Sequence, residues 1–222
     1  MRRVFWEFPL TSSFVLFTII FYFVTIAFVP KEIIKNYFVS YPGHFIPLNW
    51  LLSTFFHGSP MHLLSNMAYL FFLGRIVEDK VGKLKWLFFY LMAGIISAIT
   101  DSVIRGFIVS GYNLPTVGAS GAISGIAAVS ALLSPFSFKI LGKTMPFPVF
   151  LVSWVMIYSD LTGFSSTTDY VAHYSHLGGF FSVFITAYFL NSADRRKLRN
   201  GFYLNLTFFV LTVILLYFLK ER

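Results

Sequence analysis

The sequence predicts an all-α, polytopic membrane protein with seven transmembrane helices, because of its composition and its seven apolar runs. Of the 222 residues, 57% are hydrophobic, 12% are charged and 29 are Phe. A soluble domain of this length would contain roughly 25% charged residues, so the composition excludes both a soluble globular fold and intrinsic disorder. Each apolar run is long enough, or nearly so, to cross the hydrocarbon core of a bilayer, which is about 30 Å thick.

The expected transmembrane helices follow one another at regular intervals. They lie at about 11–29, 57–75, 84–104, 118–133, 146–161, 170–190 and 202–219. No signal-peptide cleavage site stands out before Lys31, so we expect the first helix to be retained. The connection at 30–56 combines helix-breaking Pro and Gly with aromatic residues, and we expect it to lie in the membrane interface. We therefore expect residues 1–222 to form a single membrane domain.

The basic residues set the expected orientation. The formal net charge is +8, but Lys and Arg fall in short clusters between the apolar runs, which favours membrane orientation over nucleic-acid binding. With the N-terminus inside, the inner segments hold twelve Lys or Arg and the outer segments hold five. We therefore expect an integral protein of the cell membrane, with a cytoplasmic N-terminus and an outer C-terminus. The absence of Cys excludes a disulfide framework, a thiol nucleophile and a Cys-based metal site.

The fourth apolar run differs from the others because it has few large side chains. Between Gly118 and Ala131, eleven of fourteen residues are Gly, Ala or Ser, so neighbouring helices can approach its backbone closely. From Ser120 to the helix-breaking Ser134–Pro135 pair is about fifteen residues, or about 22 Å of helix, which is shorter than the hydrocarbon core. We therefore expect Ser120 to lie below the outer surface, surrounded by protein or by a water-filled cavity.

Polar side chains inside the spans indicate a chemical site, since each costs a few kcal/mol in hydrocarbon and tends to be functional. His62 and Asn66 are four residues apart and share a helix face. In the sixth span, His176 precedes a Gly-Gly pair. By the predicted orientation these side chains reach the depth of Ser120, and a serine, a base and two donors suit acyl transfer. The other histidines in the spans are His57 and His173.

At these positions the chain resembles the rhomboid intramembrane serine proteases, over about residues 54–181. The resemblance is carried by the motifs His57-x4-His62-x3-Asn66, Gly74-x3-Glu78-x3-Gly82, Gly118-x-Ser120-Gly121 and His176-x2-Gly179. It implies that Ser120 is the nucleophile and His176 the general base. It also implies that His62, Asn66 and the backbone N–H of Ser120 form the oxyanion hole. The positions with structural roles near the site would be His57, Gly74, Glu78, Gly82, Gly118, Gly121 and Gly179.

The resemblance also implies a fold and a kind of substrate. The fold would be the rhomboid-like helical bundle of prokaryotic type, with a six-helix core at about 11–190, a short central span carrying the serine, and an added seventh helix at about 202–219. Substrates would be transmembrane proteins, cut in or just outside the outer half of a helix. They would reach the site laterally, past the fifth span and under the polar loop at 162–169, through an opening on the outer side. No cofactor, metal or nucleic acid is expected, and the lipid bilayer is the surrounding partner.

The sequence predicts a two-residue catalytic dyad of Ser120 and His176. The acids of the chain, Asp160 among them, lie at span ends or in loops, and none is placed by sequence to complete a triad. Packing of the helices at Gly121, Gly178 and Gly179 would then have to orient the imidazole. Histidine suits the role of base because its unperturbed pKa lies near neutrality.

Three positions depart from the family pattern. Leu48–Asn49 replaces the Trp-Arg pair that is common in the first loop, so anchoring of that loop is expected to differ. Val183 replaces a Gly and predicts looser packing between the fourth and sixth spans. Ser124 replaces an aromatic residue that stacks on the catalytic histidine in some members.

Alternative interpretations remain open on the sequence. His173, one turn before His176, is an alternative base, and Ser124 is an alternative nucleophile, although a packing role for Ser124 is favoured. A catalytically inactive rhomboid-like protein that binds membrane clients would share the fold. A metal or haem protein using the four span histidines is disfavoured because no Glu or Cys accompanies them and because Gly118-x-Ser120-Gly121 would have no role.

Overall fold

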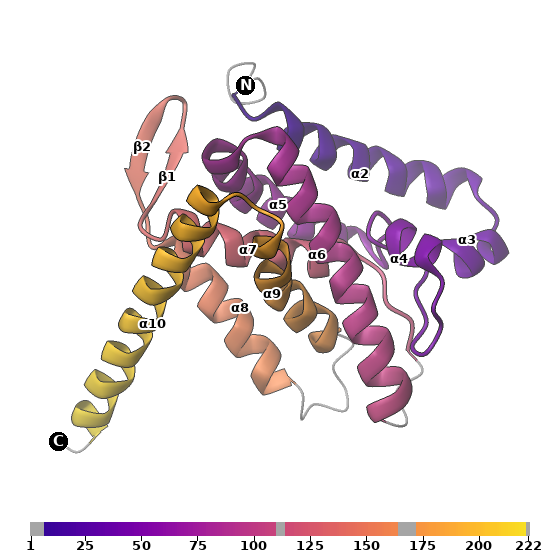
Figure 1. Cartoon of the computed structure of the whole chain (residues 1–222). Coiled ribbons are helices and arrows are strands. Elements are labelled where there is room, and N and C mark those ends of the chain that lie inside the picture. The colour runs from indigo at the N-terminus through magenta and orange to yellow at the C-terminus, as the bar shows by residue number, and fades with distance from the viewer. Residues whose placement is uncertain (1–6, 110–113, 164–171, 221–222) are drawn as a thin grey trace.

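The computed structural model describes residues 7–109, 114–163 and 172–220, and these residues are almost entirely helical (Figure 1). The helices are α2 (Pro9–Phe28), α3 (Lys31–Tyr37), α4 (Pro47–Ser53), α5 (Pro60–Val81), α6 (Lys83–Val103), η1 (Ile104–Ile108), α7 (Ser120–Leu133), α8 (Val149–Gly163), α9 (His173–Tyr188) and α10 (Ser192–Lys220). Two short strands, β1 (Ser137–Ile140) and β2 (Lys143–Pro146), form an antiparallel hairpin in which Ser137 pairs with Pro146. The all-α class is confirmed, with the hairpin as a small addition.

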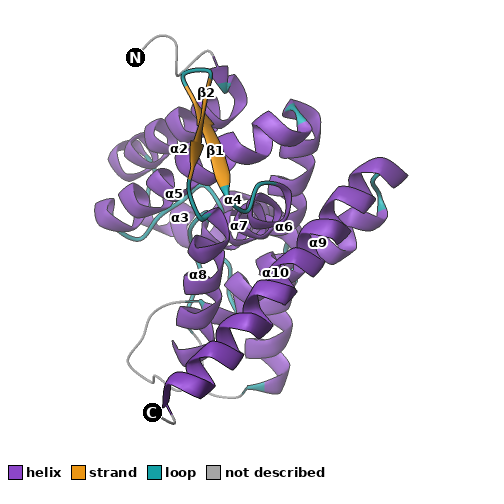
Figure 2. Cartoon of the chain, turned by 90° about the vertical axis from the view of Figure 1, so that its left-hand side faces the viewer, coloured by secondary structure: helices purple, strands orange, loops and turns teal. Residues whose placement is uncertain are grey.

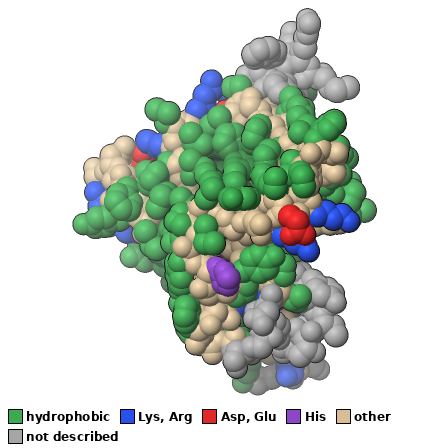
Figure 3. Space-filling model, turned by 90° about the vertical axis from the view of Figure 1, so that its right-hand side faces the viewer, with side chains coloured by type: hydrophobic (Ala, Val, Ile, Leu, Met, Phe, Trp, Pro, Cys, Tyr) green, Lys and Arg blue, Asp and Glu red, His purple; other side chains and the backbone are tan. Residues whose placement is uncertain are grey.

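Seven of the helices correspond to the seven expected spans: α2, α5, α6, α7, α8, α9 and α10. Within the described residues, α2, α6 with η1, and α10 are long and apolar enough to cross a membrane, and α7 and α8 are shorter apolar helices. The described N-terminal and C-terminal parts of the chain lie at opposite ends of the molecule in Figure 1. Hydrophobic side chains cover much of the face drawn in Figure 3, as expected of a surface in contact with lipid.

Helix α7 lies at the centre of the bundle, with α5, α6, α8 and α9 around it (Figure 1). Its 14 residues correspond to about 21 Å of helix, so the expected shortness of the serine-bearing span is confirmed. The side chains from Gly121 to Ala127 are all buried. The central position therefore follows from the small side chains, which leave room for neighbours on all sides.

Helix α9 approaches the backbone of α7 very closely. A Cβ placed on Gly179 would overlap the carbonyl oxygen of Gly121, and a Cβ on Gly121 would overlap the Ser97 hydroxyl of α6. Both obstacles leave little freedom, since one is backbone and the other is a short side chain buried in the bundle. Glycine at these two positions thus sets how near α6, α7 and α9 can lie. The predicted structural role of Gly121 and Gly179 is in keeping with these contacts.

Glu78, in the Gly74-x3-Glu78-x3-Gly82 motif, links the end of α5 to the start of α2. The Glu78 carboxylate accepts hydrogen bonds from Leu10 N at 3.0 Å, Thr11 N at 2.8 Å and Thr11 Oγ1 at 2.7 Å. It therefore caps the first turn of α2, where backbone N–H groups have no partner within the helix and where negative charge is favoured. A Cβ on Gly74 would lie 2.8 Å from the Thr11 Cγ2 atom, so the same contact requires a small residue on α5.

The hairpin lies at the same end of the molecule as the described start of the chain (Figure 1). Its turn, Leu141–Gly142, has positive φ at both residues, 51° and 76°. Turns of this kind match the twist of a two-stranded hairpin. Backbone N–H groups of both turn residues donate to the Glu7 carboxylate, at 3.0 Å and 2.9 Å. The connection between α7 and α8 is thus an ordered hairpin tied to the residues that precede α2.

We expect Glu78→Ala to lower the free energy of unfolding by about 3 kcal/mol, because it removes a buried charged acceptor from three donors. The measurement is unfolding of the purified protein in mixed detergent micelles. Asp79→Asn is the matched control: Asp79 forms only partly exposed ion pairs with Lys80 and Lys139, so its loss should change stability by less than about 1 kcal/mol. Equal stability of the two variants would contradict the capping role.

Candidate active site

A glycine turn leads directly into the helix that bears Ser120. Gly118 has φ +115°, a conformation that favours glycine, and its N–H donates to the Ser53 carbonyl at 2.9 Å. A Cβ at Gly118 would lie 2.7 Å from His62 Cε1 and 3.3 Å from Asn66 Nδ2. The imidazole and the amide therefore pack against the turn two residues before Ser120, as their shared helix face predicts.

A polar network outside α7 holds this turn in place. Thr116 pairs with Ser40 through two backbone hydrogen bonds of 2.8 Å and 3.0 Å. Its hydroxyl donates to Asp101 Oδ2 at 2.8 Å, and Arg105 Nε donates to Asp101 Oδ1 at 2.8 Å. Sequence reasoning missed this network. Its available signal was the opposite charges of Asp101 and Arg105, four residues apart in an otherwise apolar segment.

His57 packs against the turn that precedes Ser120. Its side chain is 1% exposed, and its Nε2 lies 3.5 Å from the Ala119 backbone nitrogen. Its ring packs edge-on against the His62 ring, with centroids 5.0 Å apart. Fully buried and in contact with His62, His57 is placed to orient that side chain, in keeping with the structural role predicted for it.

Asn66 offers a donor toward the same region. The residue is 6% exposed, and its Nδ2 has no hydrogen-bond partner within the part of the chain that the structure describes. A buried amide without a partner carries a free-energy penalty, which a ligand oxygen would relieve. Helix α7 begins at Ser120, so its first backbone N–H groups also lack partners within the helix. The Asn66 amide and the first backbone N–H groups of α7 thus lie near the same turn, the one that precedes Ser120.

Helix α9 brings the turn that contains His176 next to the first turn of α7. A Cβ on Gly121, the residue after the serine, would lie 2.8 Å from Ser175 Oγ, the residue before the histidine. Ser120, His62 and His176 are each partly exposed, so all three can be reached by a ligand. Ser120 Oγ forms no hydrogen bond with any described residue. The first turn of α7 and the turn of α9 that contains His176 are therefore neighbours without a serine–histidine hydrogen bond between them.

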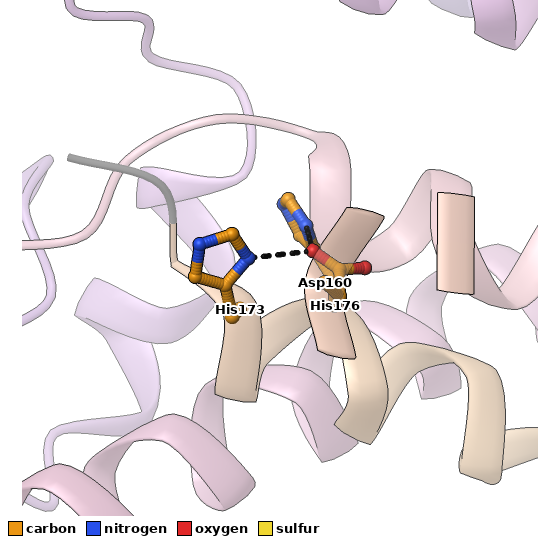
Figure 4. Close-up of side chains that lie close together, drawn as sticks. All are labelled: Asp160, His173 and His176. Carbon is orange, nitrogen blue, oxygen red and sulfur yellow. Dashed lines mark hydrogen bonds and ion pairs between the residues drawn. The ribbon is translucent and has the colours of Figure 1, made fainter. Parts of the chain in front are cut away.

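The expectation that no acid orients the imidazole is wrong. Asp160, near the end of α8, lies between two histidines of α9, and its Oδ1 is 2.8 Å from His176 Nδ1 and 2.9 Å from His173 Nδ1 (Figure 4). The Asp160 side chain is 5% exposed. The sequence did not reveal this contact because Asp160 is sixteen residues before His176, on a different helix, and its direction depends on how α8 packs against α9.

This contact has a chemical consequence for the tautomer of His176. An ionised carboxylate can only accept hydrogen bonds, so the proton of a neutral imidazole facing it sits on Nδ1. The lone pair then lies on Nε2, which is the form that a general base requires. His173 shares the same carboxylate oxygen and is more deeply buried, with its side chain 8% exposed against 16% for His176.

The positions that depart from the family pattern each have a structural counterpart. Asn49 is buried, and its Nδ2 donates to the Asn36 and Val39 carbonyls at 2.8 Å and 3.1 Å, which ties α4 to the segment that ends α3. Ser124 is fully buried and donates to the Ser120 carbonyl at 2.9 Å, which favours packing over nucleophilic chemistry. Val183 is 4% exposed and belongs to the hydrophobic core.

These features define a helical membrane protein with a serine at the start of a short central helix and with histidines on two flanking helices. A family model for the rhomboid domain matches residues 46–193, well over half of the chain. The chain belongs to the rhomboid family.

Curated relatives include a protein named as a rhomboid protease and proteins named only as rhomboid-like. The chain is 31% identical to the mitochondrial presenilin-associated rhomboid-like protein of Homo sapiens over 157 residues, 69% of this chain and 41% of that protein. It is 28% identical to rhomboid-like protein 11, chloroplastic, of Arabidopsis thaliana over 138 residues, 59% of this chain and 48% of that protein. It is 26% identical to rhomboid protease AarA of Providencia stuartii over 188 residues, 74% of this chain and 67% of that protein. The chain thus spans less than half of the first two relatives.

Asp160, His173 and His176 also form a group that could hold a metal ion, since one ligand atom from each lies within 4.8 Å of the others. Two imidazoles and a carboxylate are a common donor set for zinc. The same short contacts are equally the hydrogen bonds that orient a base, and the sequence predicts that no metal takes part.

We therefore expect a reporter-cleavage assay to give the same rate before and after treatment of the purified protein with a chelator. The reason is that Asp160 already satisfies both imidazole Nδ1 atoms through hydrogen bonds. Metal analysis of the same sample by mass spectrometry is the control. Stoichiometric zinc, together with activity that disappears on chelation and returns with zinc, would make this cluster a metal centre instead.

Proposed function

We propose that this chain is an intramembrane serine endopeptidase that cleaves transmembrane segments of other membrane proteins. The observation that carries the proposal is the meeting of three elements at one place: Ser120 at the start of α7, His62 and Asn66 against the turn before it, and His176 on the facing turn of α9. The naming of AarA as a rhomboid protease supports the same activity.

In this mechanism, Ser120 Oγ attacks the scissile carbonyl carbon while His176 Nε2 accepts the hydroxyl proton. The proton passes to the leaving amine, and an acyl ester on Ser120 remains until water hydrolyses it. Asp160 keeps Nδ1 of His176 protonated and stabilises the imidazolium that forms between these steps. The proposed catalytic group is therefore the predicted pair of Ser120 and His176, with Asp160 as a carboxylate that orients the imidazole. His62, Asn66 and the Ser120 N–H would hold the oxyanion, and each such donor typically contributes about 10²- to 10³-fold in kcat.

The proposed substrates are transmembrane helices because Ser120, His62 and His176 belong to helices of an apolar bundle of membrane-spanning character. Substrate access past α8, through an opening on the outer side of the cell membrane, remains part of the proposal. In support, α8 has only three buried residues, Val149, Ser153 and Asp160, far fewer than α7. The loop expected to cover this route is 162–169, and its residues 164–169 lie outside the described residues.

We expect Ser120→Ala and His176→Ala to abolish cleavage of a single-span reporter by the full chain in detergent, since each removes a reacting group. His173→Ala should retain measurable cleavage, because Asp160 can still hold His176. The measurement is product formation on gels, with reporter binding followed in parallel.

Other outcomes of this assay would indicate a different base or a different function. Loss of cleavage only with His173→Ala would assign the base to the previous turn of α9. Binding of the reporter without cleavage by the unaltered chain would favour a client-binding, rhomboid-like protein, the alternative left open by the sequence.

We expect Asp160→Asn to lower kcat by about 10- to 10³-fold while KM changes little, because an amide can donate to Nδ1 and stabilise the wrong tautomer. The pH–rate profile of the variant should also be displaced from that of the unaltered chain, which a purely structural role would not produce. Glu32→Gln, on the exposed surface of α3, removes the same charge away from the site and should leave both parameters unchanged. An unaltered kcat in Asp160→Asn would contradict the positioning role.

A further inference from the structure

A groove with a volume of about 830 Å³ lies between α9 and α10, away from Ser120. Its apolar wall includes Leu132, Phe184 and Phe202, and the rings of Phe184 and Phe202 contact each other with centroids 5.8 Å apart. Its other wall includes Arg195, Arg196 and Arg199 from the first turns of α10. Apolar surface and concentrated positive charge therefore lie side by side.

The groove exists because α10 packs closely against the bundle on one side only. A Cβ on Gly201 would overlap the Leu132 carbonyl oxygen, and Asn205 Nδ2 donates to the Ala131 carbonyl at 3.0 Å. Toward α8, the contact continues through the Phe150 and Phe208 rings, 5.8 Å apart. Toward α9, the Phe184–Phe202 pair is the one ring contact between the described residues of the two helices, and α10 runs obliquely across this face (Figure 2).

The arginines of the groove carry charge that no carboxylate of the described residues neutralises. Arg195, Arg196 and Arg199 are exposed, and none of them forms a salt bridge with a described residue. The nearest carboxylate on the same helix, Asp194, is already paired with Lys85 and lies 3.9 Å from Lys197 Nζ. Three guanidinium groups thus face the groove, and guanidinium is the side chain best suited to bind phosphate.

We propose that this groove binds an anionic phospholipid, with its phosphate at the three arginines and an acyl chain along Phe184 and Phe202. The position along α10 supports a lipid over a soluble anion, because the basic first turns of the helix give way at Phe202 to a mostly apolar run that contains no charged residue before Lys220. This change marks the level of the lipid headgroups, where arginine meets phosphate and aromatic rings meet the acyl chains. The proposal does not depend on proteolytic activity.

The test is native mass spectrometry of the full chain in detergent, with phosphatidylglycerol or phosphatidylcholine added at equal concentration. We expect phosphatidylglycerol to be retained at least about tenfold better, since each basic residue near an anionic lipid is worth about fivefold and some of this is lost to screening. The triple variant Arg195→Gln/Arg196→Gln/Arg199→Gln should lose this preference. The control Lys35→Gln/Lys83→Gln/Lys143→Gln removes the same charge from exposed sites outside the groove and should keep it.

Two further arms separate a lipid from other ligands. Inorganic phosphate at millimolar concentration should not displace phosphatidylglycerol, and Phe184→Gln/Phe202→Gln should weaken its retention while the arginines remain. Should the triple arginine variant fail to fold, each single Arg→Gln variant is expected to lose about fivefold. Equal retention of both lipids by the unaltered chain, equal loss in the lysine control, or displacement by phosphate would overturn the proposal.

Discussion

The backbone of α7 lies directly against glycines of α9 and α10 and against the short Ser97 side chain of α6, and the positions of these helices depend on the contact. Gly121 meets α6 and α9 at one level, and the Leu132 carbonyl meets Gly201 of α10 near the other end. Small-residue contacts of this kind replace the hydrophobic driving force that is absent between helices in lipid. Because the obstacles are mostly backbone atoms, the spacing of the bundle has little room to adjust.

Polar contacts then fix what the close packing alone would leave free, namely the directions of loops and side chains. Asp101, Arg105 and Thr116 hold the turn before Ser120, and Asp160 holds the imidazoles of α9. Breaking one partner of a buried charged pair is strongly destabilising, because the other is left without compensation. In a bundle with few charged residues, each such contact therefore specifies one local arrangement.

Most of the architecture was predictable from sequence because it depends on local patterns. The apolar runs gave the spans, the Gly, Ala and Ser run gave a short central helix, and the i, i+4 spacing placed His62 and Asn66 on one face. The contact of Asp160 with His176 was not predictable, because it depends on the rotation of α8 relative to α9. The hairpin was missed as well, since its turn places Leu141 at positive φ, which the residue type does not indicate.

The sharing of one oxygen between two imidazoles was equally hidden, and so was the groove beside α10. Both depend on surfaces that only meet after packing: His173 and His176 are one turn apart on the same helix, whereas their common partner lies on another. The sequence identified the arginines near 195–199 only as an indicator of orientation. These arginines line the same groove as Phe184 because α9 and α10 are neighbours in the fold.

The two ends of the described chain differ in how firmly they are attached. Glu7 is hydrogen-bonded to the hairpin and Thr11 to Glu78 of α5, so the start of α2 is attached to the bundle at two places. Beyond Phe209, in contrast, the side chains of α10 from Val210 to Leu219 are exposed. A fluorophore or fusion partner joined after α10 would therefore leave the packing around Ser120 undisturbed, whereas one joined close to α2 would compete with those hydrogen bonds.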